Sequence, residues 1–560
     1  MLSHVQGPTD APLLDLTIGA ALDAASRRWG DRPAVVDRGQ GVRLSWSELR
    51  QRADRFAAGL LRLGLEPGQR IGVWSLNRVE WTLTQFAAAK AGLILVTINP
   101  AYRLAELEYA LRDSGCAALV LVSAFKTSDY VGMIRSLMPE MADATDGSIH
   151  AERLPELRRI IQMSPDPAPG ALSFAQVEAL GDDAGLAALA AISARLTPDD
   201  PVNIQFTSGT TGAPKGVTLS HRNILNNGYF TGKGIDLGPE DRLCIPVPLY
   251  HCFGLSMGNL ACVAHGAAMV YPGEGFDAGA TLRTVAAERC TALYGVPTMF
   301  IAELDHPDFA SFDLSSLRTG IMAGSPCPIE IMRRVADEMH MSEVTICYGM
   351  TETSPVSFQS GTADPLERRV STVGRVHPHV EVKIVDADGE TVPYGVAGEL
   401  CTRGYSVMLG YWGQPAATAA VKDTEGWMHS GDLATLDAQG FCNIVGRLKD
   451  MVIRGGENLY PREIEEFLYR HPSIRDVQVF GVPDPRYGEE LCAWVVLQEG
   501  ADLSADALRA FCANQIAHQK IPRYVKFVET FPMTVTGKVQ KFAMREAMMS
   551  ELALEVAATA

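Results

Sequence analysis

The sequence predicts an α/β protein: a large N-terminal region of several subdomains with parallel sheets, followed by a small mobile C-terminal α/β lid. Short β-rich runs alternate with amphipathic helical patterns in the first part of the chain. Beyond about residue 380 the pattern changes to short runs typical of antiparallel strands, and a compact helix–strand pattern begins at Pro461. Because strands that alternate with helices favour parallel sheets, the first of these patterns decides the fold class.

The N-terminal elements follow from periodicity. Residues 45–64 predict an amphipathic helix, since Leu49, Ala53, Phe56 and Leu60 fall on one face. Short apolar runs at 71–74, 93–96 and 118–122 predict strands, and residues 105–113 predict a helix between the last two. Residues 137–170 are rich in Met, Pro, Asp and Gly, so we expect a surface excursion there.

In the second half, residues 380–385 and 398–402 predict antiparallel strands after a turn at 386–389. The Asp-Ala-Asp-Gly sequence of this turn is also half of a calcium loop, but the remaining ligands are missing and a hairpin turn is favoured. From Pro461 we expect a helix with Ile464, Phe467 and Leu468 on one face, strands at 477–480 and 491–497, and a helix over 505–519. The charged segment 446–450 sets the boundary, which gives domains of residues 1–448 and 449–560.

Composition excludes several classes of protein. The 560 residues are 47% hydrophobic with a mean hydropathy near zero, which is ordinary for a chain with several packed cores. A net charge of −17 argues against a nucleic-acid partner. The N-terminus has no secretory pattern, and the apolar stretch 252–271 is interrupted by glycines and His265, so we expect no transmembrane segment. Peripheral contact with a membrane stays open.

The eleven cysteines are isolated, without a C-x-x-C pair. We therefore expect reduced thiols that fill core space and a cytoplasmic location.

The strongest chemical signal is the segment Thr207-Ser-Gly-Thr-Thr-Gly-Ala-Pro-Lys-Gly216, which follows the β-like run 202–206. Hydroxyl residues and glycines in such a loop let backbone N–H groups converge on an anion, and Lys215 adds positive charge. The spacing is not that of a Walker A loop. A flexible linker is the alternative, and it is disfavoured because Pro-Lys-Gly leads directly into a patterned helix.

With five further segments, this loop resembles the adenylate-forming (ANL) superfamily of acyl-CoA synthetases, adenylation domains and luciferases. The other segments are Pro248-Leu-Tyr-His-Cys-Phe-Gly254, Cys347-Tyr-Gly-Met-Thr-Glu-Thr353, Ser430-Gly-Asp-Leu433, residues 446–465 and Pro532-Met-Thr-Val-Thr-Gly-Lys538. The resemblance covers nearly the whole chain. Residues 321–328 and 348–355 look most like those of medium-chain fatty acyl-CoA ligases.

The resemblance implies ATP, Mg²⁺ and the co-substrate coenzyme A (CoA), with a role for each matching residue. The catalytic residues are Lys538, His251, Thr351 and Glu352, and the metal ligands are Thr207 and Glu352. The nucleotide and CoA residues are Thr207, Ser208, Gly209, Thr210, Thr211, Gly212, Lys215, Gly324, Tyr348, Asp432, Arg447, Lys449, Gly455 and Gly456. Within this set Lys449 is the hinge of the lid.

Each residue type suits its assigned role. Tyr348 offers a flat face to a purine, Asp432 has acceptors for ribose hydroxyls, and oxygen atoms of Thr351 and Glu352 suit magnesium. The two glycines at 455 and 456 permit close approach of the backbone to a pantetheine arm. Structural roles stay open as alternatives: a core tyrosine or histidine, a helix-terminal glutamate, a surface lysine at 538, and plain turns.

The segments around the acyl site indicate the class of acid. Amino-acid adenylation domains carry an aspartate in the segment that corresponds to 248–254, and this chain has none there. The expected acyl walls are residues 250–258, 294–299, 322–325 and 349–356, in which His251 and Glu352 are the ionisable side chains. An uncharged, apolar carboxylic acid fits such a lining.

We therefore predict an ATP-dependent acyl-CoA ligase that forms acyl-AMP and then the CoA thioester, with a medium-chain fatty acid as substrate. Three alternatives stay open: an acyl-AMP ligase that loads a carrier protein, a CoA ligase for an aromatic or branched acid, and a nucleotide-binding scaffold without activity. The expected partners are small molecules, namely the acid, ATP and CoA. The oligomeric state does not follow from the sequence.

Overall fold

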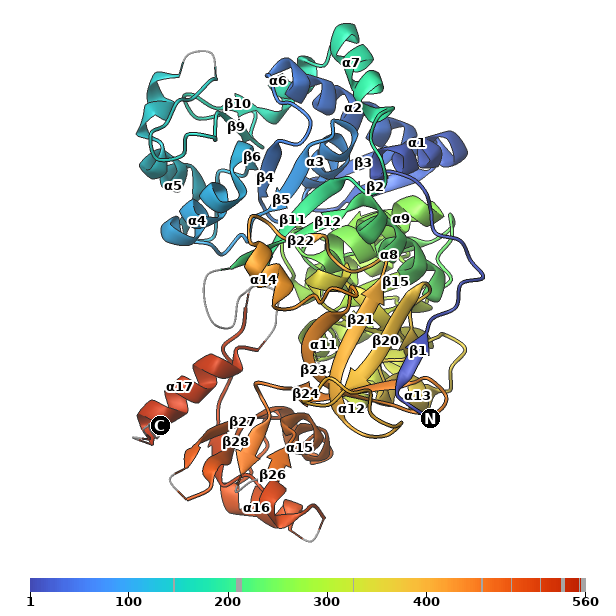
Figure 1. Cartoon of the computed structure of the whole chain (residues 1–560), viewed down its shortest axis with the longest axis vertical. Coiled ribbons are helices and arrows are strands. Elements are labelled where there is room, and N and C mark those ends of the chain that lie inside the picture. The colour runs from blue at the N-terminus through green and yellow to red at the C-terminus, as the bar shows by residue number, and fades with distance from the viewer. Residues whose placement is uncertain are drawn as a thin grey trace.

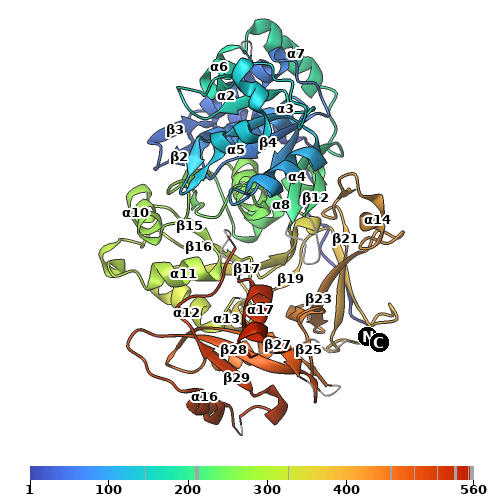
Figure 2. The same cartoon turned by 90° about the vertical axis from the view of Figure 1, so that its left-hand side faces the viewer.

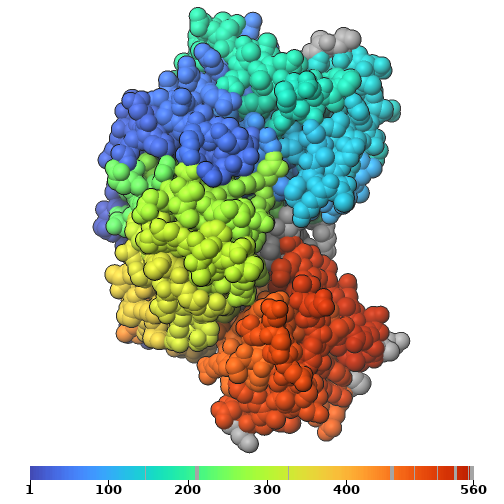
Figure 3. All heavy atoms as spheres, turned by 180° about the vertical axis from the view of Figure 1, so that it is seen from behind, coloured from blue at the N-terminus to red at the C-terminus, as the bar shows by residue number. Residues whose placement is uncertain are grey.

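Two large sheets and two sheets of five strands organise the part of the chain that is described by the computed structural model, namely residues 1–144, 147–207, 214–325, 327–454, 457–484, 486–513, 515–534, 539–552 and 554. Figures 1 and 2 show the first sheet and its helices at one end of the molecule and the C-terminal sheet at the other. Figure 3 shows the C-terminal residues as a lobe set apart from the first sheet. The α/β class expected from the sequence is confirmed.

The first sheet has the strand order β10-β9-β6-β4-β5-β11-β12-β22, parallel from β10 to β11 and antiparallel beyond it. Its strands are β4 (Arg70–Trp74), β5 (Ile94–Thr97), β6 (Cys116–Leu121), β9 (Arg159–Gln162), β10 (Leu172–Ser173), β11 (Pro201–Thr207), β12 (Lys215–Ser220) and β22 (Gly410–Tyr411). Its helices are α1 (Ile18–Trp29), α2 (Trp46–Arg62), α3 (Val79–Lys90), α4 (Leu104–Ser114), α5 (Tyr130–Leu137), α6 (Phe174–Ala179) and α7 (Asp183–Ser193), and the short pair β7 (Ala124–Phe125) and β8 (Ser128–Asp129) lies at its rim. The predicted elements 45–64, 71–74, 93–96, 105–113 and 118–122 are confirmed.

Helix α2 illustrates why these residues form these elements. Ser45 caps the helix and Glu48 completes a capping box, so the first free amides have acceptors. The stripe Leu49, Ala53 and Leu60 is fully buried. Burial of this face, rather than local helix propensity, supplies most of the stability of such a helix.

The second sheet has the order β19-β18-β17-β16-β15-β13-β14-β2-β3, with parallel pairing from β17 to β2. Its strands are β2 (Pro33–Asp37), β3 (Val42–Ser45), β13 (Arg242–Cys244), β14 (Ala268–Tyr271), β15 (Ala292–Gly295), β16 (Thr319–Ala323), β17 (Glu343–Gly349), β18 (Val356–Gln359) and β19 (Arg375–Val376). The accompanying helices are α8 (His221–Gly234), the π-helix Phe253–Leu260, α9 (Ala261–His265), α10 (Ala278–Glu288), α11 (Pro297–Leu304), α12 (Ile329–Glu338) and α13 (Leu366–Ser371). Single 3₁₀ turns lie at Pro139–Asp143, Phe309–Ser311 and Thr351–Thr353.

The third sheet is antiparallel with the order β1-β20-β21-β23-β24. Its strands are β1 (His4–Gln6), β20 (Val380–Val385), β21 (Gly398–Gly404), β23 (Met428–Leu436) and β24 (Cys442–Arg447), and α14 (Pro415–Ala419) precedes β23. The strands predicted at 380–385 and 398–402 are confirmed. The predicted turn is also present, with the Gly389 amide bonded to the Asp386 carbonyl and a φ of 82° at Gly389.

The C-terminal sheet has the order β26-β25-β28-β27, with β29 beside β28. Its elements are β25 (Val452–Arg454), β26 (Glu457–Leu459), α15 (Pro461–Leu468), β27 (Ile474–Asp484), β28 (Gly488–Leu497), α16 (Ala505–Cys512), the 3₁₀ turn His518–Lys520, β29 (Tyr524–Phe527) and α17 (Lys541–Glu551). Ile464 and Leu468 are buried, which confirms the predicted face of α15. Glu465 on this helix accepts from Lys541 at 2.5 Å and so ties α17 to α15.

Two predictions of secondary structure are wrong in part. Residues 137–170 do not form only a surface excursion, because β9 joins the first sheet and Ile160 and Ile161 on it are buried. The helix expected over 505–519 ends at Cys512, since the ψ of Ala513 is 133°, an extended conformation. The chain must reach β29 beside β28 within a few residues, and a longer helix would point away from it.

The eleven cysteines and the long apolar stretch occupy the positions expected of core residues. Every cysteine side chain is buried. The stretch 252–271 forms the π-helix, α9 and β14, and most of its side chains lie in the core. Among the described residues, no helix is both long and apolar enough to cross a membrane.

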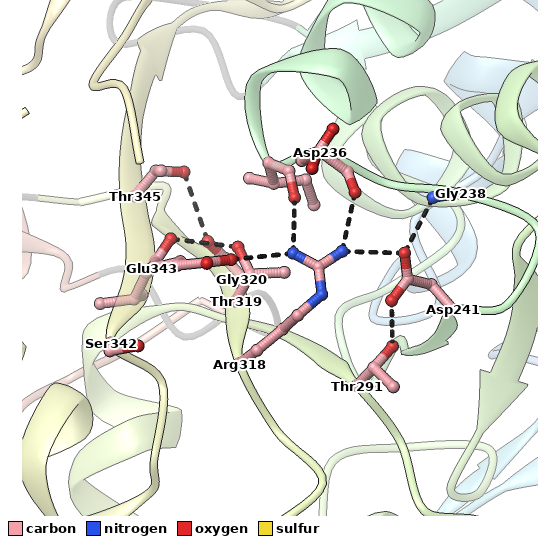
Figure 4. A network of polar contacts seen from close by, with 12 residues as sticks. Asp236, Gly238, Asp241, Thr291, Arg318, Thr319, Gly320, Ser342, Glu343 and Thr345 are labelled. Atoms are coloured by element: carbon pink, nitrogen blue, oxygen red, sulfur yellow. Dashed lines mark hydrogen bonds and ion pairs between the residues drawn. The ribbon is translucent and has the colours of Figure 1, made fainter. Parts of the chain in front are cut away.

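A polar network fixes the amino ends of the second sheet (Figure 4). Arg318, directly before β16, bonds the Asp236 carbonyl at 2.7 Å and the Asp241 carboxylate at 2.8 Å, and it reaches Glu343 at the start of β17 at 2.9 Å. Thr291, before β15, donates to Asp241 at 2.7 Å. The starts of β13, β15, β16 and β17 are therefore held in register, which also fixes where their carboxyl ends lie.

Replacing Arg318 with Met is expected to destabilise the N-terminal region by about 1.5–3 kcal/mol, because the mostly buried Asp241 loses its cationic partner. Calorimetric unfolding measures the loss. Arg333→Met is the matched control: its ion pairs with Glu330 and Glu367 are exposed, and it should cost at most about 1 kcal/mol. Equal losses in the two variants would contradict a structural role for the network.

Candidate active site

Three neighbouring parallel strands, β15, β16 and β17, end at the edge opposite the Arg318 network. Gly295 pairs with Met322 and Ala323 pairs with Cys347, so their carboxyl ends lie side by side. Gly324 follows β16 with a φ of 95°, a conformation that favours glycine. In open sheets with parallel strands, ligands bind at this carboxyl edge.

The turn after β17 requires glycine for a second reason. A Cβ on Gly349 would lie 1.7 Å from the Pro355 carbonyl oxygen, so the chain can fold back only without a side chain there. The turn is then held from both sides. Ser256 of the π-helix donates to the Ser354 carbonyl at 3.1 Å, and Ser354 donates to the Ser406 carbonyl at 2.5 Å. Residues 349–356 are thereby fixed between the acyl-wall segments and β22.

His251 lies in the turn that opens the π-helix. Its carbonyl accepts from the amides of Gly254 and Leu255, and the Phe253 amide points to its Nδ1 at 3.4 Å. The Phe253 ring packs against Tyr294 at the end of β15, with centroids 5.4 Å apart. The predicted acyl-wall segments 250–258, 294–299, 322–325 and 349–356 therefore belong to one part of the fold.

Tyr411, which the sequence analysis did not predict as a site residue, contacts both Glu352 and Lys215. The Tyr411 hydroxyl donates to Glu352 Oε1 at 2.9 Å, and Lys215 Nζ lies 5.0 Å from the centroid of the Tyr411 ring. Strand β22 brings Tyr411 here because it pairs with β12, which begins at Lys215. The phenol thus stands between a carboxylate and an ammonium group that would otherwise attract each other.

Glu352 is 7% exposed, and burial raises the pKa of its carboxyl group above the usual value. The Tyr411 hydrogen bond and the positive charges of Lys215 and Arg447 oppose this effect. The neighbouring Thr351 is buried as well. A buried carboxylate with a hydroxyl beside it and cationic groups nearby suits binding of a hard cation together with phosphate.

A second cluster joins the second and third sheets. The Tyr348 hydroxyl donates to Asp432 Oδ2 at 2.5 Å, and Arg447 Nε lies 3.1 Å from Asp432 Oδ1. Burial and the Asp432 charge raise the pKa of Tyr348 well above its usual value, so the phenol stays protonated and donates. Asp432 and Arg447 face each other across β23 and β24. A flat ring, a carboxylate and a guanidinium group side by side can hold a nucleoside.

Asp432 sits in a bulge of β23. Between the register pairs Glu399–Leu433 and Cys401–His429, β21 contributes one residue and β23 contributes three, 430–432. The Gly431 amide donates to Glu399 Oε1 at 3.0 Å, and Gly431 has a φ of 70°. Ser430 donates to the Leu400 carbonyl at 2.7 Å. Glu399, absent from the sequence prediction, therefore helps to set the shape that presents Asp432.

The anion loop is described only at its ends. Thr207 at the end of β11 pairs with Lys215 at the start of β12, and its hydroxyl lies 3.4 Å from the Lys215 carbonyl oxygen. Of the predicted site residues, Ser208, Gly209, Thr210, Thr211, Gly212, Gly455, Gly456 and Lys538 lie outside the described residues. Lys449 is exposed, two residues after Arg447.

The sequence carried weak signals for the missed residues. Tyr411 belongs to Gly410-Tyr-Trp412, and Glu399 to Gly398-Glu-Leu400, short segments without a distinctive spacing. Their importance comes from the pairing of β22 with β12 and of β21 with β23, which lie far apart in the sequence.

Comparison with known families matches the two parts of the chain to two models. Residues 22–412 match "AMP-binding enzyme" and residues 463–538 match "AMP-binding enzyme C-terminal domain".

Individual proteins are similar over nearly the full length. The medium-chain acyl-CoA ligase ACSF2, mitochondrial, of Danio rerio is 46% identical over 99% of this chain and 91% of its own. A protein of Bacillus subtilis (strain 168) named "Putative acyl-CoA synthetase YngI" is 47% identical over 96% of this chain and 98% of its own. Among solved structures, the anthranilate CoA ligase AuaEII in complex with anthranoyl-AMP has a TM-score of 0.85 at 26% identity, covering 97% of this chain and 99% of that one.

Proposed function

The chain belongs to the AMP-binding enzyme family, and we propose that its reaction is the ATP-dependent ligation of a medium-chain fatty acid to CoA. The acid's carboxylate attacks the α-phosphate of ATP to give acyl-AMP and pyrophosphate, and the CoA thiol then displaces AMP to give the thioester. The protein is an acid–thiol ligase. The observation that carries the proposal is that one turn joins two clusters: Tyr348, directly before it, contacts Asp432, which pairs with Arg447, and Glu352, within it, contacts Tyr411, whose ring faces Lys215.

In this proposal the nucleotide spans both clusters. Tyr348 and Gly324 flank the adenine, and Asp432 and Arg447 bind the ribose hydroxyls. Lys215 and the loop 207–212 bind the phosphates, where backbone amides and a fixed positive charge are worth most. Lys538 is assigned from the resemblance of segment 532–538 to the family's lysine motif. Its proposed role is to neutralise charge as the carboxylate attacks phosphorus.

A magnesium ion fits the donors around Glu352. Its carboxylate is buried and takes one neutral hydrogen bond from Tyr411, and Thr207 and Thr351 add hydroxyl oxygens. Mg²⁺ prefers one or two protein oxygens together with phosphate and water. When bound, the ion would neutralise charge on the phosphates. The chain's own contribution is the Tyr411 hydroxyl, which favours the ionised form of Glu352 against the effect of burial.

The acid is proposed from the lining. His251 is assigned to the carboxylate of the acid through its sequence segment, and the described residues of the wall segments are otherwise uncharged apart from Glu352. The named activity of the Danio rerio relative supports a medium chain. An aromatic acid is the second candidate, because the solved structure with a similar fold reported above is that of an anthranilate CoA ligase. A carrier-protein acceptor and an inactive scaffold are the remaining alternatives.

We also propose a reducing compartment, with the cytoplasm as the expected one. The eleven buried thiols support the reducing environment. One relative is named as mitochondrial and another comes from a bacterium, so the relatives do not indicate one compartment. The proposal of a cytoplasmic location is therefore supported by the buried thiols alone.

Pyrophosphate release against a panel of acids, from acetate to stearate with benzoate and anthranilate added, tests the proposal. We expect the highest kcat/KM for acids of about six to twelve carbons, because each buried CH₂ contributes about 0.8 kcal/mol. If continued pyrophosphate release requires CoA, the enzyme is a CoA ligase rather than an enzyme that loads a carrier protein. A benzoate-type acid that exceeds every straight chain by about tenfold would assign the aromatic alternative.

Tyr411→Phe tests the role of the bridging phenol. The hydrogen bond from Tyr411 lowers the pKa of Glu352, so its loss raises that pKa further and protonates Glu352 at a higher pH. Because the ionised form is the one that binds the cation, the acid limb of the kcat/KM profile should move to higher pH. Tyr394→Phe, which removes a hydroxyl in the connection between β20 and β21, is the matched control. An unmoved acid limb in Tyr411→Phe would contradict this role.

The two half-reactions need different groups, so we propose that the lid turns about Lys449. Lys538 serves adenylation and the Gly455–Gly456 loop serves the thiol, and 82 residues separate Lys538 from Gly456. The hydrogen bonds described at the junction come from the amides of Leu448, Asp450 and Met451, which leaves residue 449 as the position that can absorb a large backbone change.

Lys449→Pro should retain acyl-AMP formation and lose most thioester formation, because proline fixes φ and restricts Leu448. Lys538→Ala should do the reverse, failing with ATP and acid while still converting supplied acyl-AMP and CoA. Single-turnover measurements of each half-reaction provide the readout, with Lys449→Ala as control for loss of the charge. Equal losses in both halves for both variants would rule out the alternation.

A further inference from the structure

Three side chains with metal-binding donor atoms converge in the third sheet, outside the groups assigned above to ATP, acid and CoA. Glu399 and Cys401 lie on β21, and His429 lies opposite Cys401 on β23. His429 Nδ1 is 2.9 Å from Glu399 Oε2 and 3.4 Å from Cys401 Sγ, and the three donor atoms all lie within 4.8 Å of one another. We propose that Glu399, Cys401 and His429 form a site for a transition-metal ion of the Zn²⁺ type, and that its occupancy weakens nucleotide binding.

The distances fit such an ion. With bonds of about 2.3 Å to sulfur and about 2.0 Å to nitrogen, tetrahedral zinc places the two ligand atoms about 3.5 Å apart. The observed 3.4 Å between Cys401 and His429 needs almost no change. The His429–Glu399 contact of 2.9 Å is a hydrogen-bond distance and must open by a few tenths of an ångström. A thiolate, an imidazole and a carboxylate favour zinc, cobalt or copper over magnesium.

The surroundings allow an ion to enter. Cys401 is buried, whereas the side chains of His429 and Glu399 are 35% and 20% exposed. A fourth ligand position therefore opens on the solvent side. Binding releases the Cys401 thiol proton to solvent. His429 Nδ1 donates to the Glu399 carboxylate in the metal-free protein, so it binds the ion once its proton has moved to Nε2. Burial and the charge of Glu399 raise the pKa of the Cys401 thiol, and the charge of Lys383 opposes them only in part, so the ion must displace this proton. The carboxylates of Glu399 and Asp423 supply negative charge that attracts a cation.

The site is linked to Asp432 through Glu399. One carboxylate oxygen of Glu399 faces His429, and the other accepts from the Gly431 amide in the bulge that presents Asp432. A metal ion that draws this carboxylate toward Cys401 lengthens or breaks the bond to Gly431. Asp432 then loses part of its support, and its geometry toward Tyr348 and Arg447 changes. This link rests on the proposed nucleotide site, whereas metal binding itself does not.

Cobalt titration of the metal-free full-length enzyme, without nucleotide, tests the site. We expect one equivalent of Co²⁺ to produce the near-ultraviolet charge-transfer band of cobalt bound to thiolate. Cys401→Ser should abolish the band, and Cys442→Ser, which changes a buried thiol on β24 of the same sheet, should keep it. His429→Gln should weaken Co²⁺ binding by at least about tenfold. No band in the unsubstituted enzyme, or an unchanged band in Cys401→Ser, overturns the site.

Single-turnover pyrophosphate release from ATP and acid, measured without CoA because its thiol binds zinc, tests the link. Buffered Zn²⁺ should raise the ATP concentration that gives the half-maximal rate by about tenfold or more in the unsubstituted enzyme, the scale of a lost charged hydrogen bond, and leave Cys401→Ser unaffected. Equal inhibition of both enzymes, or none in an enzyme that shows the cobalt band, overturns the link. A failure of the proposed function is distinct, since no pyrophosphate would form even without zinc while the cobalt band would still report on the site.

Discussion

Asp432 is 7% exposed, and a carboxylate at this depth must be compensated by hydrogen bonds and positive charge or it destabilises the fold. Its partners come from two different sheets: Tyr348 from the end of β17 and Arg447 from the end of β24. Satisfying this one group therefore fixes the third sheet against the carboxyl edge of the second. The flat ring, the acceptor oxygens and the guanidinium group take their relative positions from the same requirement. The same contacts of Asp432 therefore determine both the geometry of the proposed nucleoside site and the packing of the two sheets.

A second constraint is the separation of opposite charges before a ligand arrives. Lys215 is near enough to Glu352 for its positive charge to lower the pKa of that carboxyl group, against the larger effect of burial, and a direct ion pair would neutralise both charges. Tyr411 prevents this because its hydroxyl donates to the carboxylate while its ring faces the ammonium group. Each charge is thus kept ready for a charge on the substrate. Preorganisation of this kind lowers the reorganisation that the reaction would otherwise require.

Sequence reasoning succeeded where the signal is local. The stripe Leu49, Ala53, Leu60 predicted α2, and the apolar runs predicted β4, β5 and β6, because burial of one face acts within a few residues. It failed for β9, because the apolar run around Ile160 and Ile161 is too short to indicate a strand within a segment rich in Met, Pro and Gly. The motif residues Tyr348, Glu352 and Asp432 were found by resemblance, and their mutual contacts required the fold. Tyr411 and Glu399 were missed because strand pairing across distant segments gives them their position.

The ribose cluster and the proposed hinge share one short segment, which constrains how the lid can respond to nucleotide. Arg447 ends β24 and contacts Asp432, and the next amide, of Leu448, donates to the Gly431 carbonyl in the bulge. Residue 449 follows inside a turn, which the amides of Asp450 and Met451 close by donating to the Arg447 carbonyl. The Arg462 side chain of α15 also reaches back to the Ile444 carbonyl on β24 at 2.9 Å. In the proposed function, a nucleotide bound to Asp432 and Arg447 would stiffen the strand that leads to the C-terminal sheet, so the proposed rotation would be confined to the residues after Leu448. The proposed position of the hinge follows from where these contacts stop.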